Sequence, residues 1–328
     1  MIPISISFDM RVPDLGTAPN DLYAAALDLC EYVDDKGFDF AWTMEHHGAA
    51  DGYLPSPLTL AAAIGARTKR MRVMAGVVIL PLHDPVRVAE EMAVVDLISN
   101  GRLDVVFGAG YVPSEFEMFK RDLHARGKAL DEGVPIIQRA LAGERFTADG
   151  REIFVRPLPV QQPIPIMMGG SVPIAAKRAA RLGAGLCPMH PGIIPVYLEE
   201  CEKLGREPGR IVLNVAQLHI AEDPDKGWHD IGPHVLQHFR SYAEMTGGIE
   251  EGSGSPYAGL DTIEKARASG MIRVVTPDEA VEICRQGEAM NAGVTLHPLL
   301  GGMSPKLAFE SAELFVDKVM PRIRPASR

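Results

Sequence analysis

The chain alternates short apolar runs with longer segments that have the periodicity of amphipathic helices. Eight apolar runs of this kind occur, at residues 4–8, 38–43, 71–81, 102–110, 163–170, 184–189, 210–221 and 293–300. Each run is apolar on both faces, which is typical of parallel strands that are covered by helices. Eight βα units predict an α/β fold, a (β/α)8 TIM barrel. An open doubly wound sheet is the alternative, and periodicity alone does not separate the two.

Two stretches interrupt the repeat. Residues 145–157 are typical of a β-hairpin with its turn at Asp149-Gly150. Residues 222–275, after the seventh run, are polar and glycine-rich, with a helical pattern only near 233–245. So long an insertion predicts a lid, a binding loop or disorder. With no Pro/Ser-rich linker, the sequence predicts a single barrel domain over residues 1–328 that carries this insertion.

Charge and composition exclude several classes of function. The formal net charge of −10 disfavours nucleic acid, because phosphate neutralisation needs a basic face. No apolar run approaches the roughly 18–20 residues of a membrane span, and the N-terminus lacks the basic segment of a signal peptide. The four cysteines form no CxxC pair, which favours reduced thiols over disulfides or a zinc ribbon. We therefore expect a cytoplasmic protein without a nucleic-acid or membrane partner.

Three polar residues, Glu45, His46 and His47, follow the second apolar run at its carboxyl end. Active sites of (β/α)8 barrels lie at this end of the strands. Imidazole titrates near neutral pH, so a histidine there suits proton transfer. The alternative interpretation is a solvated polar loop. No metal site is predicted, because adjacent histidines do not point to one centre as the pair of an HExxH helix does.

Small residues at two other strand ends suggest a close approach of a ligand. Gly76 lies inside the third run, where a glycine indicates a bulge, a ligand or tight packing. Gly108, Ala109 and Gly110 end the fourth run. They lack the third glycine of a dinucleotide fingerprint, so they predict a small-residue shelf beside a ligand rather than a Rossmann site.

A third glycine segment predicts a phosphate site. Gly169, Gly170 and Ser171 follow the fifth run and precede a helical pattern that starts near Pro173. Glycines let backbone N–H groups face an anion, and the helix dipole favours it. Ser171 either donates to the same anion or caps the helix. Lesser candidates are three histidines near the ends of late strands, His190, His219 and His297.

These segments resemble the bacterial-luciferase-like superfamily, which contains FMN-dependent monooxygenases and deazaflavin-dependent oxidoreductases. The similar stretches are WTMEHH (42–47) and residues 77–111, 163–185, 274–282 and 304–321. The resemblance covers most of the chain and fails mainly across residues 190–273. It implies a (β/α)8 barrel, in agreement with the count of apolar runs.

The resemblance also implies residue roles. His46 matches the catalytic histidine, and Glu45 or His47 would orient it. Gly76-Val77 falls where the family has a non-proline cis peptide that braces the isoalloxazine ring, and 169–171 matches the phosphate loop. Ala109 stands where bacterial luciferase has an arginine near the flavin phosphate, which leaves the reductant preference open.

The function implied is a monooxygenase that uses reduced FMN, supplied by a separate flavin reductase, and dioxygen to oxidise a small organic substrate. The alternatives are a deazaflavin-dependent oxidoreductase that transfers hydride without oxygen, and a non-catalytic flavin-binding subunit. The Glu-His-His triplet favours FMN, because the deazaflavin enzymes more often have Asp-His there. A homodimer is expected from the family, and the substrate is not given by the sequence.

Overall fold

A computed structural model describes residues 1–249 and 255–324. The chain forms two compact units. Unit 1 contains residues 1–41, 46–55 and 214–328, and unit 2 contains residues 42–45 and 56–213. The chain first passes from unit 1 to unit 2 within β2 (Phe40–Thr43).

Unit 1 is built on four parallel strands in the order β10, β9, β11, β1. These strands are β1 (Ile4–Phe8), β9 (Asn214–Ile220), β10 (Ile272–Val275) and β11 (Gly293–Leu296). Its helices are α1 (Pro19–Val33), α8 (Pro224–Met245), α9 (Ile263–Ser269), α10 (Pro277–Ala289), α11 (Pro305–Leu314) and α12 (Met320–Ile323). Ile6 of β1 lies opposite Leu296 of β11, so these two strands end side by side.

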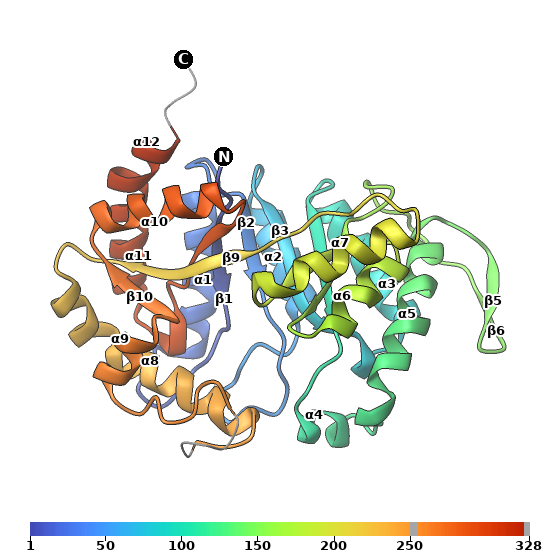
Figure 1. Ribbon diagram of the computed structural model, residues 1–328, viewed down its shortest axis with the longest axis horizontal. Coiled ribbons are helices and arrows are strands. Elements are labelled where there is room, and N and C mark those ends of the chain that lie inside the picture. The colour runs from blue at the N-terminus through green and yellow to red at the C-terminus, as the bar shows by residue number, and fades with distance from the viewer. Residues whose placement is uncertain (250–254, 325–328) are drawn as a thin grey trace. The chain divides into compact units, whose positions relative to one another are not determined.

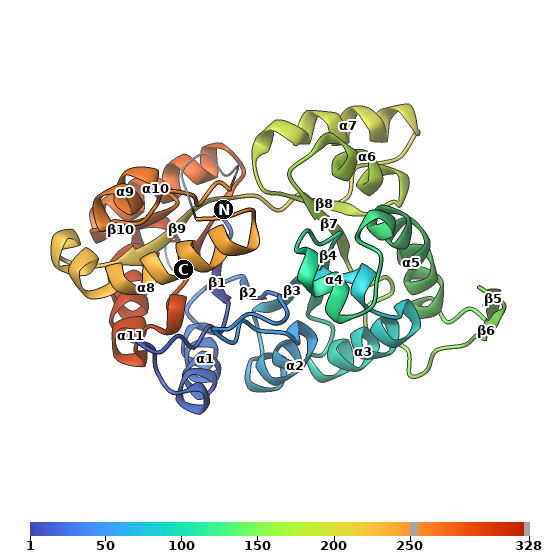
Figure 2. The same ribbon diagram turned by 90° about the horizontal axis from the view of Figure 1, so that it is seen from below.

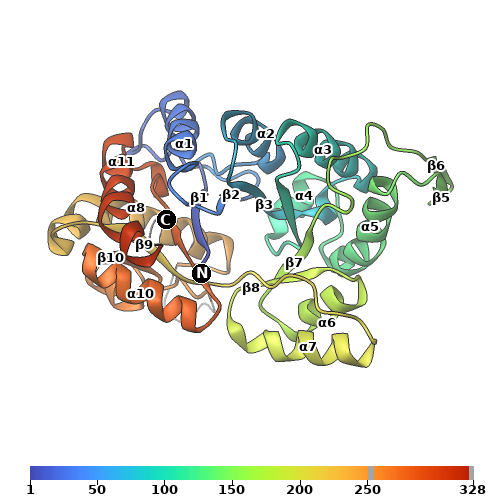
Figure 3. The same cartoon turned by 90° about the horizontal axis from the view of Figure 1, so that it is seen from above.

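Burial explains why these segments form helices and strands. All five residues of β1 are buried, and the hydroxyl groups of Ser5 and Thr295 bond each other at 2.7 Å across the strand pair. Helix α1 has Pro19 in its first turn and buries one stripe, which consists of Leu22, Ala25, Ala26, Leu29, Cys30 and Val33. Helices α1 and α11 pack together, with Tyr32 and Phe309 in edge-to-face contact at 5.9 Å (Figure 3).

The stretch predicted as an insertion is largely regular. Helix α8 has 22 residues and begins after Asp223, whose carboxylate accepts bonds from the N–H groups of Asp225 and Lys226. Trp228, Ile231, Val235 and Phe239 of α8 pack in one apolar cluster with Leu300 and Met303. Seen from below, α8 lies in front of the sheet of unit 1 (Figure 2).

A strand that the sequence did not predict lies in the same stretch. Strand β10 pairs with β9 in parallel, with Ile272 opposite Gln217 and Val275 opposite Ile220. The prediction of a loop or disorder over the whole of 222–275 is therefore wrong for α8, α9 and β10, and the alternative of a lid stays a prediction. Residues 250–254 of that stretch lie outside the described residues.

Unit 2 has four parallel strands in the order β3, β4, β7, β8. These are β3 (Arg72–Ile79), β4 (Leu103–Gly108), β7 (Ile166–Gly170) and β8 (Gly185–Pro188). Its helices are α2 (Pro57–Arg67), α3 (Pro85–Ile98), α4 (Pro113–Met118), α5 (Arg126–Leu141), α6 (Pro173–Arg181) and α7 (Ile194–Lys203). The last two helices pack side by side (Figure 2).

The predicted hairpin is confirmed. Strands β5 (Phe146–Ala148) and β6 (Arg151–Ile153) pair antiparallel, and Figure 1 shows the hairpin at the edge of unit 2. Its turn residues Asp149 and Gly150 have φ values of 49° and 70°, as a two-residue turn with two left-handed positions requires.

The predicted α/β fold of parallel βα units is confirmed, because each of the eight apolar runs contains a strand. Closure of these strands into a barrel and the division into domains stay predictions. All four cysteines lie in the described part of the chain and are free thiols. None of the described helices is long and apolar enough to cross a membrane.

Candidate active site

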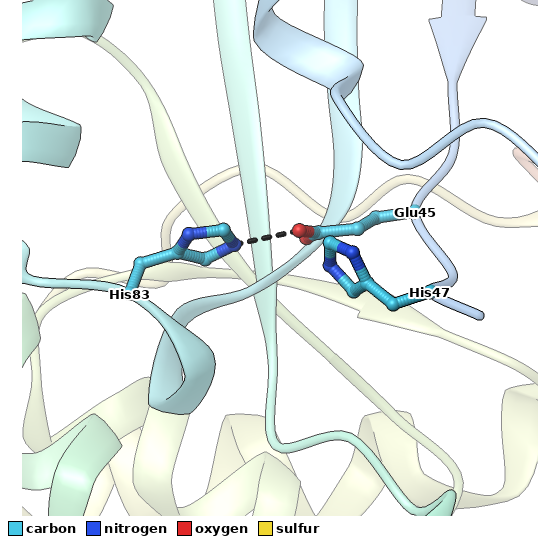
Figure 4. Close-up of side chains that lie close together, drawn as sticks. All are labelled: Glu45, His47 and His83. Atoms are coloured by element: carbon cyan, nitrogen blue, oxygen red, sulfur yellow. Dashed lines mark hydrogen bonds and ion pairs between the residues drawn. The ribbon is translucent and has the colours of Figure 1, made fainter. Parts of the chain in front are cut away.

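Glu45 is held by two hydrogen bonds just beyond the end of β2. Its Oε2 accepts a bond from the Ile79 N–H at 2.5 Å, and its Oε1 lies 2.6 Å from Nε2 of His83 (Figure 4). Burial lowers the pKa of His83, but the hydrogen bond and charge of Glu45 outweigh it and raise that pKa above its ordinary value. The sequence had singled out Glu45 but not His83, which follows the short 3₁₀ turn Leu80–Leu82.

His47 lies close to this pair. Glu45, His47 and His83 each offer one ligand atom, and these atoms lie within 4.8 Å of one another (Figure 4). Two imidazoles and a carboxylate are donors that divalent metals accept. The hydrogen bond between Glu45 and His83 already uses two of the three donors, so we assign no metal to the cluster.

His46 packs against a group of tyrosines that belongs to unit 1. Its ring is edge-on to Tyr53 at 4.7 Å and to Tyr242 at 5.9 Å. The hydroxyl groups of Tyr53 and Tyr242 bond each other at 2.9 Å, and Tyr242 stacks on Tyr257 at 4.9 Å. We call Tyr53, Tyr242 and Tyr257 the tyrosine wall. Aromatic contacts of this kind fix the plane of the His46 imidazole.

Arg11 lies behind the tyrosine wall and is fully buried. Its guanidinium is 4.4 Å from the ring centre of Tyr53 and 4.8 Å from that of Tyr242. It forms ion pairs with Asp51 at 2.5 Å and Asp9 at 3.4 Å. Asp9 and Arg11 were not predicted as site residues, although charged residues directly after an apolar strand were a signal for them.

The glycines at the ends of β4 and β7 make room for one side chain. A Cβ at Gly108 would lie 2.2 Å from Cγ1 of Val77, and a Cβ at Gly169 would lie 3.1 Å from Cγ2. The Gly76–Val77 peptide bond is cis, as the resemblance implied. Gly76 itself has no space for a side chain, because a Cβ there would lie 2.9 Å from Val106. Packing against protein atoms thus accounts for Gly76, Gly108 and Gly169.

Replacing Gly108 with alanine should lower the free energy of unfolding by about 1–3 kcal/mol, because the new methyl group collides with Val77. The same substitution should cost less in a Val77→Ala background, which lacks the colliding carbon. Chemical denaturation of the four proteins of this cycle measures the difference. Equal costs in the two backgrounds would show that Val77 is not what requires the glycine.

The other two residues of the predicted small-residue shelf are Ala109 and Gly110. Gly110 has a φ of 72°, and a Cβ there would lie 2.7 Å from Cγ2 of Ile79. Backbone conformation and packing therefore both require this glycine. Ala109 is half-buried between the two glycines.

The segment before α6 suits an anion. Gly169 and Gly170 end β7, and Ser171 and Val172 are exposed. The residue that precedes the first turn of α6 is Val172, so the interpretation of Ser171 as the helix cap is wrong. His190 lies beside this segment: its Nδ1 accepts from the Gly192 N–H at 3.2 Å, so its Nε2 donates to the Ser171 carbonyl at 2.9 Å.

Two arginines, one beside the start of β4 and one on α6, are engaged with other protein groups. Arg102 donates to the carbonyls of Gly65 and Thr68, at 2.8 and 2.7 Å, and so caps the C-terminus of α2. Arg178 pairs with Asp131 of α5 at 2.8 Å. Lys177 is exposed on α6.

His219 of β9 is buried and makes stability depend on pH. Burial lowers its pKa from 6.5 to about 4, against a smaller opposing effect of Asp230. Between these pH values the unfolded chain binds a proton that the folded chain does not, so stability falls as the pH drops. We expect His219 to contribute a slope of about 1.4 kcal/mol per pH unit to the unfolding free energy. His219→Gln should remove this slope, and the same change at the exposed His229 should leave it unchanged in denaturation at several pH values.

Comparison with known proteins adds a family to this geometry. The family model described as luciferase-like monooxygenase matches residues 3–288. Limonene 1,2-monooxygenase of Rhodococcus erythropolis is 26% identical over 318 residues, which cover 90% of the chain and 80% of the relative. The oxygenase component of the flavin-dependent trigonelline monooxygenase of Acinetobacter baylyi is 31% identical over 204 residues. These residues cover 59% of the chain and 55% of that relative.

A solved structure supports the same relationship. The crystal structure of a monooxygenase from Streptomyces bottropensis superposes with a TM-score of 0.83 at 25% identity. The superposition covers 98% of this chain and 99% of that one. The likeness therefore extends over both units.

Proposed function

The chain belongs to the luciferase-like monooxygenase family, and we propose that it uses reduced FMN and dioxygen to oxidise a small organic substrate. The observation that carries the proposal is the exposed segment before α6, which ends in a helix N-terminus whose preceding residue has no capping side chain. The names of its relatives support a monooxygenase, and one of them is flavin-dependent.

The residues present fit the phosphate of FMN. Ser171 offers an exposed hydroxyl donor. In the first turn of α6, Pro173 has no N–H and the Ala175 N–H bonds the Val172 carbonyl, so the Ile174 N–H is the backbone donor that this turn offers to a phosphate. The dipole of α6 favours a negative charge at this end. Gly169 and Gly170 complete this site, and Val77, seated between Gly108 and Gly169, would support the flavin ring.

Reduced FMN supplies the electrons that activate dioxygen, and the protein supplies orientation and proton transfer. His46 is the residue that we expect to hold or move a proton, because its buried ring is fixed by Tyr53 and Tyr242. Glu45 and His47 flank it, and Glu45 also fixes His83. The surrounding aromatic side chains exclude water from this proton.

An anaerobic titration with reduced FMN, and separately with a reduced deazaflavin, tests the cofactor. We expect tight binding of FMN and weaker binding of riboflavin, which lacks the phosphate. Ser171→Asp should weaken FMN binding and leave riboflavin binding unchanged, because the new carboxylate repels the phosphate. Thr147→Asp, at an exposed position on β5, is the matched control.

Two results would contradict this assignment. Binding of only the deazaflavin would replace the monooxygenase with a hydride-transferring oxidoreductase. Equal loss of FMN and riboflavin in Ser171→Asp would place the phosphate elsewhere. We also propose a separate reductase as partner, which the name of one relative, an oxygenase component, supports, and a homodimer remains an expectation from the family.

A further inference from the structure

Two neighbouring strand ends in unit 1 bring a carboxylate and an imidazole together. Asp9 follows β1 and His297 follows β11, and the two strands pair up to Leu296, the last residue of β11, which lies opposite Ile6. Nε2 of His297 lies 3.7 Å from Oδ1 of Asp9. Asp9 is 0% exposed and His297 is 5% exposed. The pair has the composition of an acid–base dyad, in which the carboxylate orients the ring.

The carboxylate of Asp9 is fixed from its other side. Its Oδ2 lies 3.2 Å from Nδ1 of His238 on α8 and 3.4 Å from Nε of Arg11. Burial raises the pKa of Asp9, but His297 and His238 outweigh it and hold that pKa well below its ordinary value. Asp9 is therefore a charged group that keeps its position while a proton moves nearby.

His297 is a buried polar side chain that lacks a hydrogen bond. Neither of its ring nitrogens has a hydrogen-bond partner among residues 1–249 and 255–324. Buried polar groups are nearly always paired, so both ring nitrogens of His297 are open to a hydrogen bond from a water molecule or a ligand. Because Nε2 faces Asp9, the neutral ring carries its hydrogen on Nε2, and Nδ1 is the nitrogen that can accept a proton.

Aromatic rings connect this dyad with His46. His238 is edge-on to His297 at 5.7 Å and to Tyr242 at 4.9 Å, and Tyr242 contacts His46. The two imidazoles thus stand at the ends of one continuous row of rings within unit 1. Flat aromatic surroundings favour a flat aromatic ligand.

We propose that His297 is a second proton-transferring residue of the oxidation, that Asp9 positions it, and that the substrate is a planar molecule with a weakly acidic hydroxyl group, such as a phenol. The O–H bond of the substrate breaks, its proton forms an N–H bond at Nδ1 of His297, and its electron pair stays on oxygen. The resulting imidazolium faces the Asp9 carboxylate. Loss of the proton makes the ring carbons more electron-rich, which suits attack on an oxidant. This proposal rests on the proposed monooxygenase function, which supplies that oxidant.

The proton transfer is testable without flavin, by use of 4-nitrophenol, whose phenolate absorbs visible light. Bound to the wild-type chain below the pKa of the free probe, it should show a phenolate-to-phenol ratio about tenfold higher than in solution, a shift of one pKa unit. His297→Gln and Asp9→Asn should lose this shift, with the fold checked by circular dichroism. His219→Gln, at another buried histidine with an unpaired ring nitrogen, should keep it.

Binding of 4-nitroanisole, which has no acidic hydrogen, should be equal in wild type and His297→Gln. The proposal is overturned if the probe does not bind, if bound probe ionises as it does in solution, or if His297→Gln behaves as wild type. Failure of FMN to bind in the separate titration, with the probe still ionised, would reject the cofactor and leave the dyad in place.

Discussion

His46→Ala is expected to lower the turnover of the flavin-dependent oxidation by about 100- to 10,000-fold, the usual contribution of a positioned acid or base. The imidazole is buried and held against Tyr53 and Tyr242, and alanine leaves no group there that can exchange a proton. Single-turnover oxidation, measured after rapid mixing with reduced FMN and dioxygen, separates this loss from flavin supply.

The matched control for that experiment is His229→Ala, which changes an exposed histidine of α8 and should leave turnover unchanged. FMN affinity should also be the same in wild type and His46→Ala, because His46 is not among the residues that we propose to hold the phosphate. Full turnover by His46→Ala would remove this residue from the mechanism.

Arg11→Met should lower the free energy of unfolding by about 3–5 kcal/mol, the usual result of breaking a buried ion pair. Methionine fills much of the volume of arginine, but Asp9 and Asp51 lose the cation that neutralises them. The tyrosine wall also loses its cation–π contacts. Guanidinium denaturation, analysed by linear extrapolation, measures the change.

Arg87→Met is the control, since the ion pairs of Arg87 with Glu90 and Glu91 are exposed on α3. Its cost should stay below about 1 kcal/mol, as for most surface pairs. Equal costs in the two variants would show that the buried charges of unit 1 do not depend on Arg11.

Eight strands of the parallel sheet, all except β10, could be predicted because burial on both faces leaves a local signal, a short apolar run between turns. Only the second half of helix α8 could be predicted from the sequence, because Gly227, Gly232 and Pro233 interrupt the helical pattern before it. Tertiary packing explains the glycines: a Cβ at Gly227 would lie 2.6 Å from Val274, and one at Gly232 would lie 2.6 Å from Ile263. Residues of α9 and β10 must approach α8 closely, and the sequence of α8 does not reveal those neighbours.

The site was predictable where chemistry is concentrated in a motif. The Glu45–His47 triplet and the glycine segments stand out in the sequence, whereas Asp9 and His238 are single residues that meet only in the fold. Gly108 was conspicuous in the sequence, but the reason for it was not predictable. The sequence is compatible with a ligand in contact with Gly108, whereas in the structure Val77 of the neighbouring strand occupies that space. Register between β3 and β4 decides this, and register is not local information.

Helix α8 divides its tasks along its length, which matters to anyone who wishes to redesign the enzyme. Trp228, Ile231 and Val235 anchor its earlier turns in the apolar cluster of unit 1, whereas His238 and Tyr242, in its last turns, reach Asp9 and Arg11. A mutant library in the last two turns would therefore vary the side chains that face Asp9 and Arg11, as long as it keeps Phe239, which belongs to the apolar cluster.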